Sequence, residues 1–499
     1  MERREFLERG AAVGAAIGGL VVLGSAARRE NEQEESSARA GDLPGQRTDT
    51  DRDVDDGPVG NPGDQEARPP DEVQGTERDL PAYAQEYATI VDAVEMGADP
   101  AGDRAINGVL DEQLGNDTLL WFPEGEYLIR PQRISGYRNV ALAADREGET
   151  TFVGEPGSFA GRNRFLIFEN NERLLLDGID FDFCRDDGGG KLTVRADGDV
   201  AIRNVSVRAS CASNLQVLGI SVQNQEAHGV VENFRAVNEG DNEGLTGVYV
   251  AKEHSGSITF KNCELTGFPD NGLYASAPGL SDGAGGAVHV EGGIYSNSNV
   301  SNIRVGTPDS TVRDATVVVD RQPAVDPVNV RGIRFRRGRG QVVEGCEIRY
   351  TEEAGDSFGA VVFHPDNAGA TVRDTTITVD RDRVPAIYSP YNATEYDSSQ
   401  VFENVTIDGS AAGGYGAQFV GRSGVVFRDC TIEQTGEERH GVRFANKDGC
   451  RIVDSRIDVT GVPVVVDDAV AEIRNTTIVA GDDEQHIDSE QFSNEAITP

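Results

Sequence analysis

Tyrosine and arginine residues recur at equal spacing in the middle of the chain, and both residue types can bind sugars. Three similar segments begin 30 residues apart, which puts Tyr274, Arg304 and Arg334 at matching positions. Tyrosine rings stack on sugar faces, and the guanidinium fork of arginine pairs with carboxylates such as those of uronic acids. If the segments are neighbouring β-strands, about 4.8 Å apart, these side chains form a ladder about as long as an oligosaccharide.

Other segments carry polar and aromatic residues at or beside the same position. We predict that a carbohydrate would contact Arg304 and Arg334 together with a set of binding residues: Tyr249, Asn271, Tyr274, Arg331, Tyr388 and Arg443. Gln418 holds the matching position between the last two of these. The competing interpretation is that tyrosine and arginine decorate a solvated β-face without any ligand.

Carboxylates gather near the tyrosine end of this predicted ladder. Asp270 lies four residues before Tyr274, and Asp241 and Glu243 lie one repeat earlier. Oxygen ligands of this kind bind Ca²⁺. Alternatively, two carboxylates about 5 to 9.5 Å apart act as acid and base across a glycosidic bond. Because Asp and Glu are abundant along the whole chain, a role as solvated surface residues is a third interpretation for each of them.

A repeated motif must position these side chains. Thirteen copies align on an Asn, Asp or Gly anchor with an average spacing of 28 residues, which indicates a solenoid. The residue two positions before the anchor is apolar in all thirteen copies, and the residue directly before it is charged in twelve. The anchors are Asn139, Gly178, Asn204, Asn233, Asn262, Gly292, Asp314, Gly345, Asp374, Asn404, Asp429, Asp454 and Asn475.

The alternation around the anchors predicts β-strands, because helices would show apolar residues at spacings of three and four. Asn, Asp and Gly tolerate a left-handed backbone, so the anchors suit bends between strands. A further strand aligns in several coils, at residues 247–250, 272–275, 302–305, 332–335 and 441–444. We therefore expect coils with at least two β-faces joined by bends.

This pattern resembles the right-handed parallel β-helices of the pectate-lyase superfamily, from about residue 87 to 480. Gly97-Ala98-Asp99 and the stretch 118–129, Thr-Leu-Leu-Trp-Phe-Pro-Glu-Gly-Glu-Tyr-Leu-Ile, are similar to the cap and first coil of that superfamily. The resemblance implies an all-β, right-handed parallel β-helix solenoid of about 12 to 13 coils. It also implies an N-terminal helical cap, which we expect at residues 103–114.

The superfamily includes lyases, hydrolases, epimerases, esterases and adhesins, so the resemblance is more specific for fold than for activity. In its lyases, Ca²⁺ acidifies the proton beside the uronate carboxylate and an arginine removes that proton. The resemblance therefore implies Arg304 or Arg334 as the base. It makes Asp270 a further catalytic or metal-binding candidate, with Asp241 and Glu243 as candidate ligands of a Ca²⁺ ion.

Six cysteines occur, and they do not form a zinc-binding pattern. Cys263, Cys346 and Cys430 each follow an anchor directly, so we predict that they behave as small buried hydrophobic residues. The sequence leaves open whether Cys184 and Cys211 form a disulfide.

The composition excludes several classes of protein. The 499 residues include 46 Lys and Arg against 85 Asp and Glu, a net charge of −39, and only four of the cations are lysines. Such a surface repels nucleic acid. No Walker motif occurs, which argues against a nucleotide cofactor. We interpret the acidic, lysine-poor composition as that of a halophile's protein.

The charge predicts that folding depends on salt. A net charge of −39 destabilises the compact state by self-repulsion, and molar salt screens this by shortening the Debye length to about 3 Å. We expect the thermal unfolding midpoint, followed by circular dichroism, to rise steeply between dilute buffer and molar NaCl. An unchanged midpoint would contradict the halophile interpretation.

The two ends of the chain differ from the repeated region. Residues 1–27 begin with paired arginines and continue with an apolar stretch, so they resemble a twin-arginine export signal, with an uncleaved membrane anchor as the alternative. We expect residues 28–82 to be a disordered acidic linker, residues 83–480 to form the β-helix domain, and residues 481–499 to be an acidic disordered tail. The protein would then be exported folded, to the cell surface or the medium.

These observations predict an exported protein that acts on an extracellular acidic polysaccharide as a lyase or glycoside hydrolase. The alternative is a non-catalytic polysaccharide-binding or structural protein of the cell surface. An enzyme requires converging carboxylates, at least one with a perturbed pKa, whereas a binding protein requires only the ladder. No partner besides a polysaccharide is expected, and no membrane contact beyond an N-terminal anchor.

Overall fold

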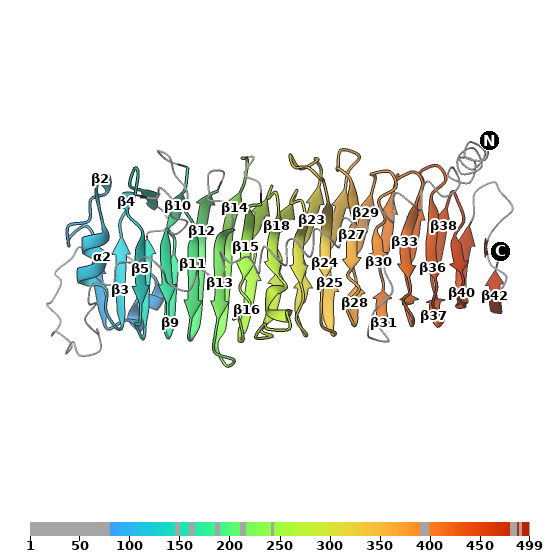
Figure 1. Ribbon diagram of the computed structural model, residues 1–499, viewed down its shortest axis with the longest axis horizontal. Helices are drawn as coiled ribbons and strands as arrows, with labels where there is room; N and C mark the ends of the chain where they lie inside the picture. The colour runs from blue at the N-terminus through green and yellow to red at the C-terminus, as the bar shows by residue number, and fades with distance from the viewer. Residues whose placement is uncertain are drawn as a thin grey trace, which may run out of the picture. The chain divides into compact units, whose positions relative to one another are not determined.

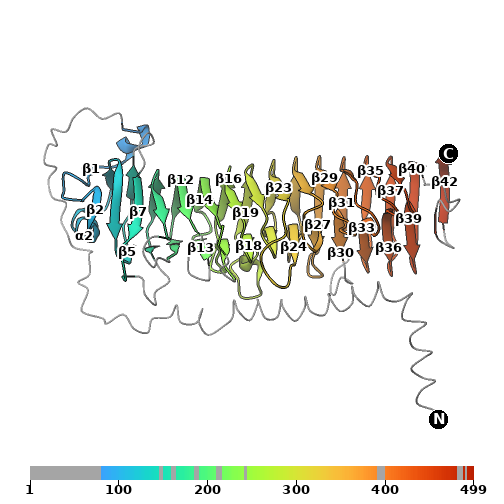
Figure 2. The ribbon, with the colours of Figure 1, turned by 90° about the horizontal axis from the view of Figure 1, so that it is seen from above.

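The computed structural model describes residues 80–144, 150–158, 165–184, 190–209, 216–240, 244–389, 399–479, 487–488 and 492–498. From Thr89 onward these residues form a solenoid in which neighbouring strands run parallel (Figures 1 and 2). Most coils contribute three strands, which stack into three faces. The predicted all-β parallel β-helix is confirmed, and the coils have three faces where the sequence predicted at least two.

The first and second faces belong to one continuous sheet. The first face contains β1 (Thr89–Asp92), β3 (Thr118–Phe122), β6 (Val140–Ala144), β9 (Arg173–Asp177), β12 (Asp199–Arg208), β14 (His228–Val237), β16 (Ser257–Lys261), β19 (Ala287–Glu291), β22 (Thr311–Arg313), β25 (Gln341–Glu344), β28 (Gly369–Arg373), β31 (Ser399–Glu403), β34 (Val426–Arg428), β37 (Cys450–Val453), β40 (Ala471–Val479) and β42 (Phe492–Thr498).

The second face follows the bend of each coil. It contains the later halves of β12, β14 and β40 together with β2 (Ala101–Ala105), β4 (Gly125–Ile129), β7 (Thr150–Gly154), β10 (Asp180–Asp182), β17 (Glu264–Thr266), β20 (Ile294–Ser296), β23 (Thr316–Val319), β26 (Glu347–Tyr350), β29 (Thr376–Val379), β32 (Thr406–Gly409), β35 (Thr431–Gln434) and β38 (Arg456–Val459).

The third face is a separate parallel sheet, and it contains the further strands predicted from the sequence. Its members are β5 (Gln132–Ser135), β8 (Leu166–Glu169), β11 (Leu192–Ala196), β13 (Gln216–Val222), β15 (Thr246–Val250), β18 (Asn271–Ala275), β21 (Ser301–Val305), β24 (Val330–Phe335), β27 (Ser357–Phe363), β30 (Ile387–Ser389), β33 (Tyr415–Val420), β36 (His440–Ala445), β39 (Val464–Asp467) and β41 (Ile487–Asp488).

The bends between the first two faces hold the repeat anchors. Twelve of the thirteen anchors have a positive φ, between 49° and 75°, as their residue types predicted. Their side chains also bond from coil to coil, since Asn233 Nδ2 donates to Asn204 Oδ1 at 3.0 Å and Asn204 Nδ2 donates to Asp177 Oδ1 at 2.6 Å. Asn139 is the exception, because it precedes β6 at the start of a first-face strand.

One such bend offers a direct test of the repeat. Asn404 has a φ of 53°, and its Nδ2 donates to Asp374 Oδ1 at 2.7 Å. Asn404→Ala should lower the unfolding free energy by about 1 to 2 kcal/mol, because alanine tolerates a left-handed backbone poorly. Asn404→Gly should cost less, because it loses only the exposed hydrogen bond. Thermal unfolding of both variants measures this, and equal losses would contradict the role given to the bend.

The core lies between the three faces, and a short helix packs against it at the first coil. This helix, α2 (Asn107–Gln113), buries Leu110 completely and begins four residues later than predicted because residues 101–105 form β2. Two 3-10 turns, η3 (Ala82–Glu86) and η4 (Ala277–Gly279), are also present. In the described part of the chain, no helix is long and apolar enough to cross a bilayer.

The predicted burial of the three anchor cysteines is confirmed. Cys263, Cys346 and Cys430 are at most 3% exposed and belong to the core. Burial raises the pKa of the Cys263 thiol to about 12, so this group is an inert part of the core. Cys211 lies outside the described residues, so a disulfide between Cys184 and Cys211 stays an open question.

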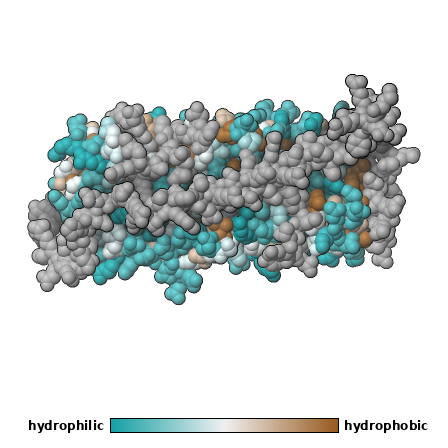
Figure 3. Space-filling model, viewed as in Figure 1, coloured by the Kyte–Doolittle hydropathy of each residue, from teal (hydrophilic) through white to brown (hydrophobic). Residues whose placement is uncertain are grey.

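The described surface is mostly hydrophilic in the view of Figure 3. Large apolar side chains exposed by more than a third are confined, among the described residues, to Met96, Ile294 and Val479. This distribution agrees with a core that takes up the apolar residues of every strand.

Candidate functional site

A row of side chains runs along the outer side of the third face. Tyr249 of β15 pairs with Tyr274 of β18, Tyr274 with Arg304 of β21, and Arg304 with Arg334 of β24. Each stands between two core residues of its strand, so alternation turns it away from the core. We call these four residues the ladder, and their register is the one predicted from the 30-residue spacing.

The first three side chains of the ladder stack on one another. The rings of Tyr249 and Tyr274 are 5.2 Å apart and inclined by only 12°, and the guanidinium carbon of Arg304 lies 4.2 Å from the centre of the Tyr274 ring. Both faces of the Tyr274 ring are therefore occupied, and a sugar cannot stack there. The far side of Tyr249 adjoins Gly219 of β13, which has no side chain.

The ladder arginines are buried, which corrects the expectation of an exposed row. Arg304 is 5% exposed and Arg334 is 1% exposed. Arg304 Nε donates to Ser276 Oγ at 2.8 Å. Burial lowers the pKa of Arg304 to about 10, with Arg336 and Arg337 acting in the same direction and Tyr274 and Asp270 opposing. Replacing either arginine will therefore affect folding as well as any binding.

A glycine is required between Ser276 and Arg336. Gly306 follows β21 between Ser276 and Arg336, and a Cβ at this position would lie 2.5 Å from the Ser276 Cβ and 3.2 Å from the Arg336 Cβ. Because real Cβ atoms do not approach so closely, glycine is required here by space. Because Gly306 has no side chain, Ser276 and Arg336 can lie on either side of it.

Asn271 and Arg331 do not project from the ladder row. Asn271 lies three residues before Tyr274, so alternation places it on the other side of β18, whereas the pairing of β24 is irregular at Arg331. Asn271 is 1% exposed, and Arg331 is fully buried with its Nη1 donating to the Val300 carbonyl at 3.1 Å. The structure thus separates both residues from the carbohydrate-contacting row to which we had assigned them.

Two other predicted binding residues extend the same row beyond Arg334. The row continues through Val362, Tyr388, Gln418 and Arg443. Arg443 Nη2 donates to Asp467 Oδ2 at 2.7 Å. Tyr388 and Arg443 lie two and four strands past Arg334, or about 10 and 19 Å along the face, so they belong to a separate stretch of it.

Asp270 lies beside the ladder and is held by hydrogen-bond donors. Thr246 Oγ1 donates to Asp270 Oδ2 at 2.7 Å, and Asn271 Nδ2 donates to Asp270 Oδ1 at 3.0 Å. Burial raises the pKa of Asp270, despite the opposing effects of these donors and of Arg304. A set of donors and a guanidinium does not fit a Ca²⁺ site, which needs oxygen ligands.

The remaining calcium candidates, Asp241 and Glu243, lie outside the described residues. Within the part of the chain that the structure describes, no group of three or more His, Cys, Asp or Glu side chains is placed to hold a metal ion.

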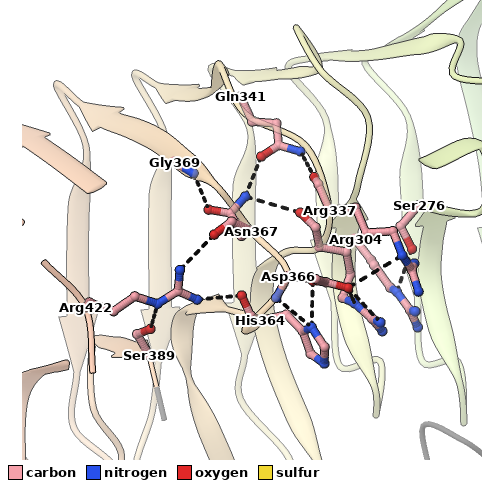
Figure 4. Close-up of polar contacts among 11 residues, drawn as sticks. Ser276, Arg304, Arg337, Gln341, His364, Asp366, Asn367, Gly369, Ser389 and Arg422 are labelled. Carbon is pink, nitrogen blue, oxygen red and sulfur yellow. Dashed lines mark hydrogen bonds and ion pairs between the residues drawn. The ribbon is translucent and has the colours of Figure 1, made fainter. Parts of the chain in front are cut away.

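A second polar group adjoins the ladder where β24 and β27 end. It comprises Arg336, Arg337, His364 and Asp366, and we call it the strand-end cluster (Figure 4). Asp366 Oδ2 lies 3.2 Å from Arg336 Nη2 and 3.5 Å from Arg337 Nε, and its Oδ1 lies 2.6 Å from His364 Nδ1. Burial alone would raise the pKa of Asp366, but His364 and both arginines outweigh it and lower that pKa.

Our sequence analysis missed the strand-end cluster, although one signal was present. The backbone pairing continues past the strands, since Arg336 N donates to the Val305 carbonyl and His364 N donates to the Phe335 carbonyl. Arg336 therefore lies two positions beyond Arg334 on the same outer side. Extending the alternation of β24 by two residues past Arg334 would have identified Arg336.

Comparison with known proteins assigns this chain to no family. No protein-family model matches the sequence, and no curated protein matches it. Among solved structures, the chain is similar to the catalytic domain of Agl-KA, at 14% identity over 81% of this chain and 67% of that one, with a TM-score of 0.43. It is also similar to the A-module of the mannuronan C-5 epimerase AlgE6 of Azotobacter vinelandii, at 17% identity over 76% and 99%, with a TM-score of 0.43.

A third similar structure is the surface protein and adhesin PfbA of Streptococcus pneumoniae, at 11% identity over 79% of this chain and 99% of that one, with a TM-score of 0.40. The β-solenoid assignment rests on the strand pairing of this chain itself.

Proposed function

We propose that this chain is an exported protein that binds an extracellular acidic polysaccharide along the outer side of the third face. The observation that carries the proposal is the continuous row of Tyr249, Tyr274, Arg304 and Arg334 on four neighbouring strands. Three strand spacings of about 4.8 Å give the row a length of about 14 Å, which suits a short stretch of polysaccharide.

The sugar contacts follow from the stacking within the ladder. Because Tyr274 is enclosed between Tyr249 and Arg304, the tyrosine ring face that no other ladder residue covers is the side of Tyr249 that adjoins Gly219, where the Gln216 amide also lies. The tyrosine hydroxyl groups can bond sugar hydroxyl groups, and arginine forks bind planar oxyanions.

The charge of the site favours an acidic ligand. Arg304 is influenced by two further arginines, Arg336 and Arg337, and by a single carboxylate, Asp270, in a protein whose overall charge is −39. Neighbouring buried cations disfavour one another, so a bound carboxylate or sulfate would stabilise them. A neutral sugar would not supply that charge.

Cleavage of the bound polysaccharide is the second candidate function. Two carboxylates beside the ladder have pKa values that are pushed apart, since burial raises that of Asp270 and partners lower that of Asp366. Such a separation is how acid and base roles are divided in active sites. In a hydrolase, Asp270, which keeps its proton to higher pH, is the proposed acid and Asp366 the proposed base. In a lyase, Arg304 or Arg334 stays the proposed base.

One experiment distinguishes these functions. The full chain is incubated in molar NaCl with acidic and neutral polysaccharides while binding, ultraviolet absorbance and reducing ends are recorded. Retention of acidic polysaccharides alone supports a surface-binding protein. An absorbance gain indicates elimination, and reducing ends without it indicate hydrolysis. If no acidic polysaccharide binds, the proposed function is wrong.

A further inference from the structure

We propose that the strand-end cluster is an oxyanion subsite whose occupation is coupled to protonation of His364. The inference rests on the proposed function, because it names the ligand group recognised beside the ladder: a sulfate ester or carboxylate of the polysaccharide. It concerns residues that the sequence analysis did not identify.

The cluster has the composition of an anion site. Two guanidinium groups, those of Arg336 and Arg337, share the one carboxylate of Asp366. Arg336 is only 7% exposed at its side chain, whereas Arg337 is 28% exposed, so one arginine is enclosed and the other reaches solvent. A second oxyanion can therefore approach Arg337 while Asp366 keeps its bond to Arg336.

The cluster also lies against the ladder, so one ligand can contact both. Arg336 and Arg337 lower the pKa of Arg304, and Tyr274 in turn raises that of Arg337. The geometry agrees, because Arg304 Nε donates to Ser276 Oγ and Gly306 lies between Ser276 and Arg336. Arg336 follows the end of β24 directly and lies two residues, about 7 Å, past Arg334 along the chain.

Hydrogen bonds hold the cluster in place before any ligand arrives. Arg422 reaches back from a later coil, where its Nη2 donates to the His364 carbonyl at 2.6 Å and its Nη1 donates to the Asn367 carbonyl at 2.7 Å. Asn367 Nδ2 donates to Gln341 Oε1 at 2.6 Å, and Figure 4 shows these residues bracing the turn that carries Asp366. A preformed site loses little freedom on binding.

His364 is the group that takes up a proton when an oxyanion binds. The charged groups that face it are Asp366 on its own turn, Arg334 and Arg336 from β24 and its end, and Arg422 at its carbonyl. Because Asp366 can only accept, His364 Nδ1 carries the hydrogen of their 2.6 Å bond. A further proton would add at Nε2 and make the ring a cation.

The direction of the coupling follows from these charges. Burial, Arg336 and Arg334 lower the pKa of His364 to about 3, with Asp366 opposing, so the ring is neutral near pH 7. A bound oxyanion adds negative charge beside the ring and raises this pKa. Between the free and bound pKa values, binding takes up a proton, so affinity must increase as the pH falls, by up to about tenfold per pH unit.

The test measures binding to the full chain in molar NaCl, of dextran sulfate between pH 3 and 7.5 and of polygalacturonate between pH 5 and 7.5. Each probe stays charged over its range, so a pH effect belongs to the protein. Calorimetry in two buffers of different ionisation enthalpy counts the protons taken up. His364→Gln keeps a donor for Asp366 but cannot titrate, and His228→Gln, an exposed histidine on β14, is the matched control.

The inference predicts that affinity for dextran sulfate rises as the pH falls toward 3 in the parent and in the His228→Gln variant, and that His364→Gln still binds but loses this rise. Binding of only one probe identifies the oxyanion as sulfate ester or carboxylate. Binding that is independent of pH, or a pH effect retained by His364→Gln, overturns the coupling and leaves the proposed function standing. If neither probe binds at any pH, both proposals are wrong.

Discussion

Replacing Arg304 and Arg334 together by glutamine should weaken binding of an acidic polysaccharide by about a hundredfold. The two guanidinium groups lie on adjacent strands of the ladder and are 5% and 1% exposed, so a ligand must displace the groups that cover them before each forms a charge-assisted bond to it. Bonds to charged groups contribute about 1.5 to 3 kcal/mol each, and two of them correspond to about two orders of magnitude in affinity. Binding assays in molar NaCl measure the effect.

Two controls separate loss of the ligand bonds from loss of the fold. The double variant with lysine at both positions keeps the charges but not the forks, so it should retain part of the affinity. Arg235→Gln removes an exposed arginine that pairs with Glu264 on the second face, and it should bind as the parent does. Unchanged affinity in a folded Arg304→Gln, Arg334→Gln variant would refute the ladder as a binding site.

Arg331→Ala should be the most destabilising of the arginine substitutions. The Arg331 side chain is fully buried, its Nη1 donates to Asn329 Oδ1 at 2.6 Å and to the Val300 carbonyl, and its guanidinium lies 4.2 Å from the Phe358 ring centre. Truncation leaves a cavity and buried acceptors without their donor, at a cost of about 3 kcal/mol or more. Thermal or denaturant unfolding measures the loss.

The control variant for Arg331→Ala is Arg235→Ala, which removes an arginine whose side chain is 55% exposed. Exposed substitutions of this kind usually change the unfolding free energy by less than about 0.5 kcal/mol. If the Arg331→Ala and Arg235→Ala variants unfold at the same midpoint, the structural role assigned to Arg331 is incorrect.

The contrast between Arg331 and Arg334 shows what the sequence left undecided within the site. Each arginine follows a β-branched apolar residue of β24. The sequence alone predicted that both arginines bind the polysaccharide. Alternation does not decide between them, because the pairing of β24 with β27 is irregular at Val330 and Arg331. The bond from Arg331 to the Val300 carbonyl, 31 residues earlier, depends on a corner between coils that no local pattern describes.

The sequence alone determined the coil and its register. Apolar residues two positions before every anchor defined the strands, and anchors able to adopt a left-handed backbone defined the bends, which twelve of thirteen do. Equal spacing then put Tyr274, Arg304 and Arg334 side by side. These features are local and periodic, so each copy of the repeat carries the information again.

Only the tertiary structure decided how the site is built on that register. The burial of Arg304, the stack that encloses Tyr274 and the sharing of Asp366 by Arg336, Arg337 and His364 all depend on side chains from different coils meeting outside the sheet. Arg422 braces this group across 58 residues. Such contacts arise from turns that differ in length and sequence from coil to coil, and a repeat pattern contains no information about them.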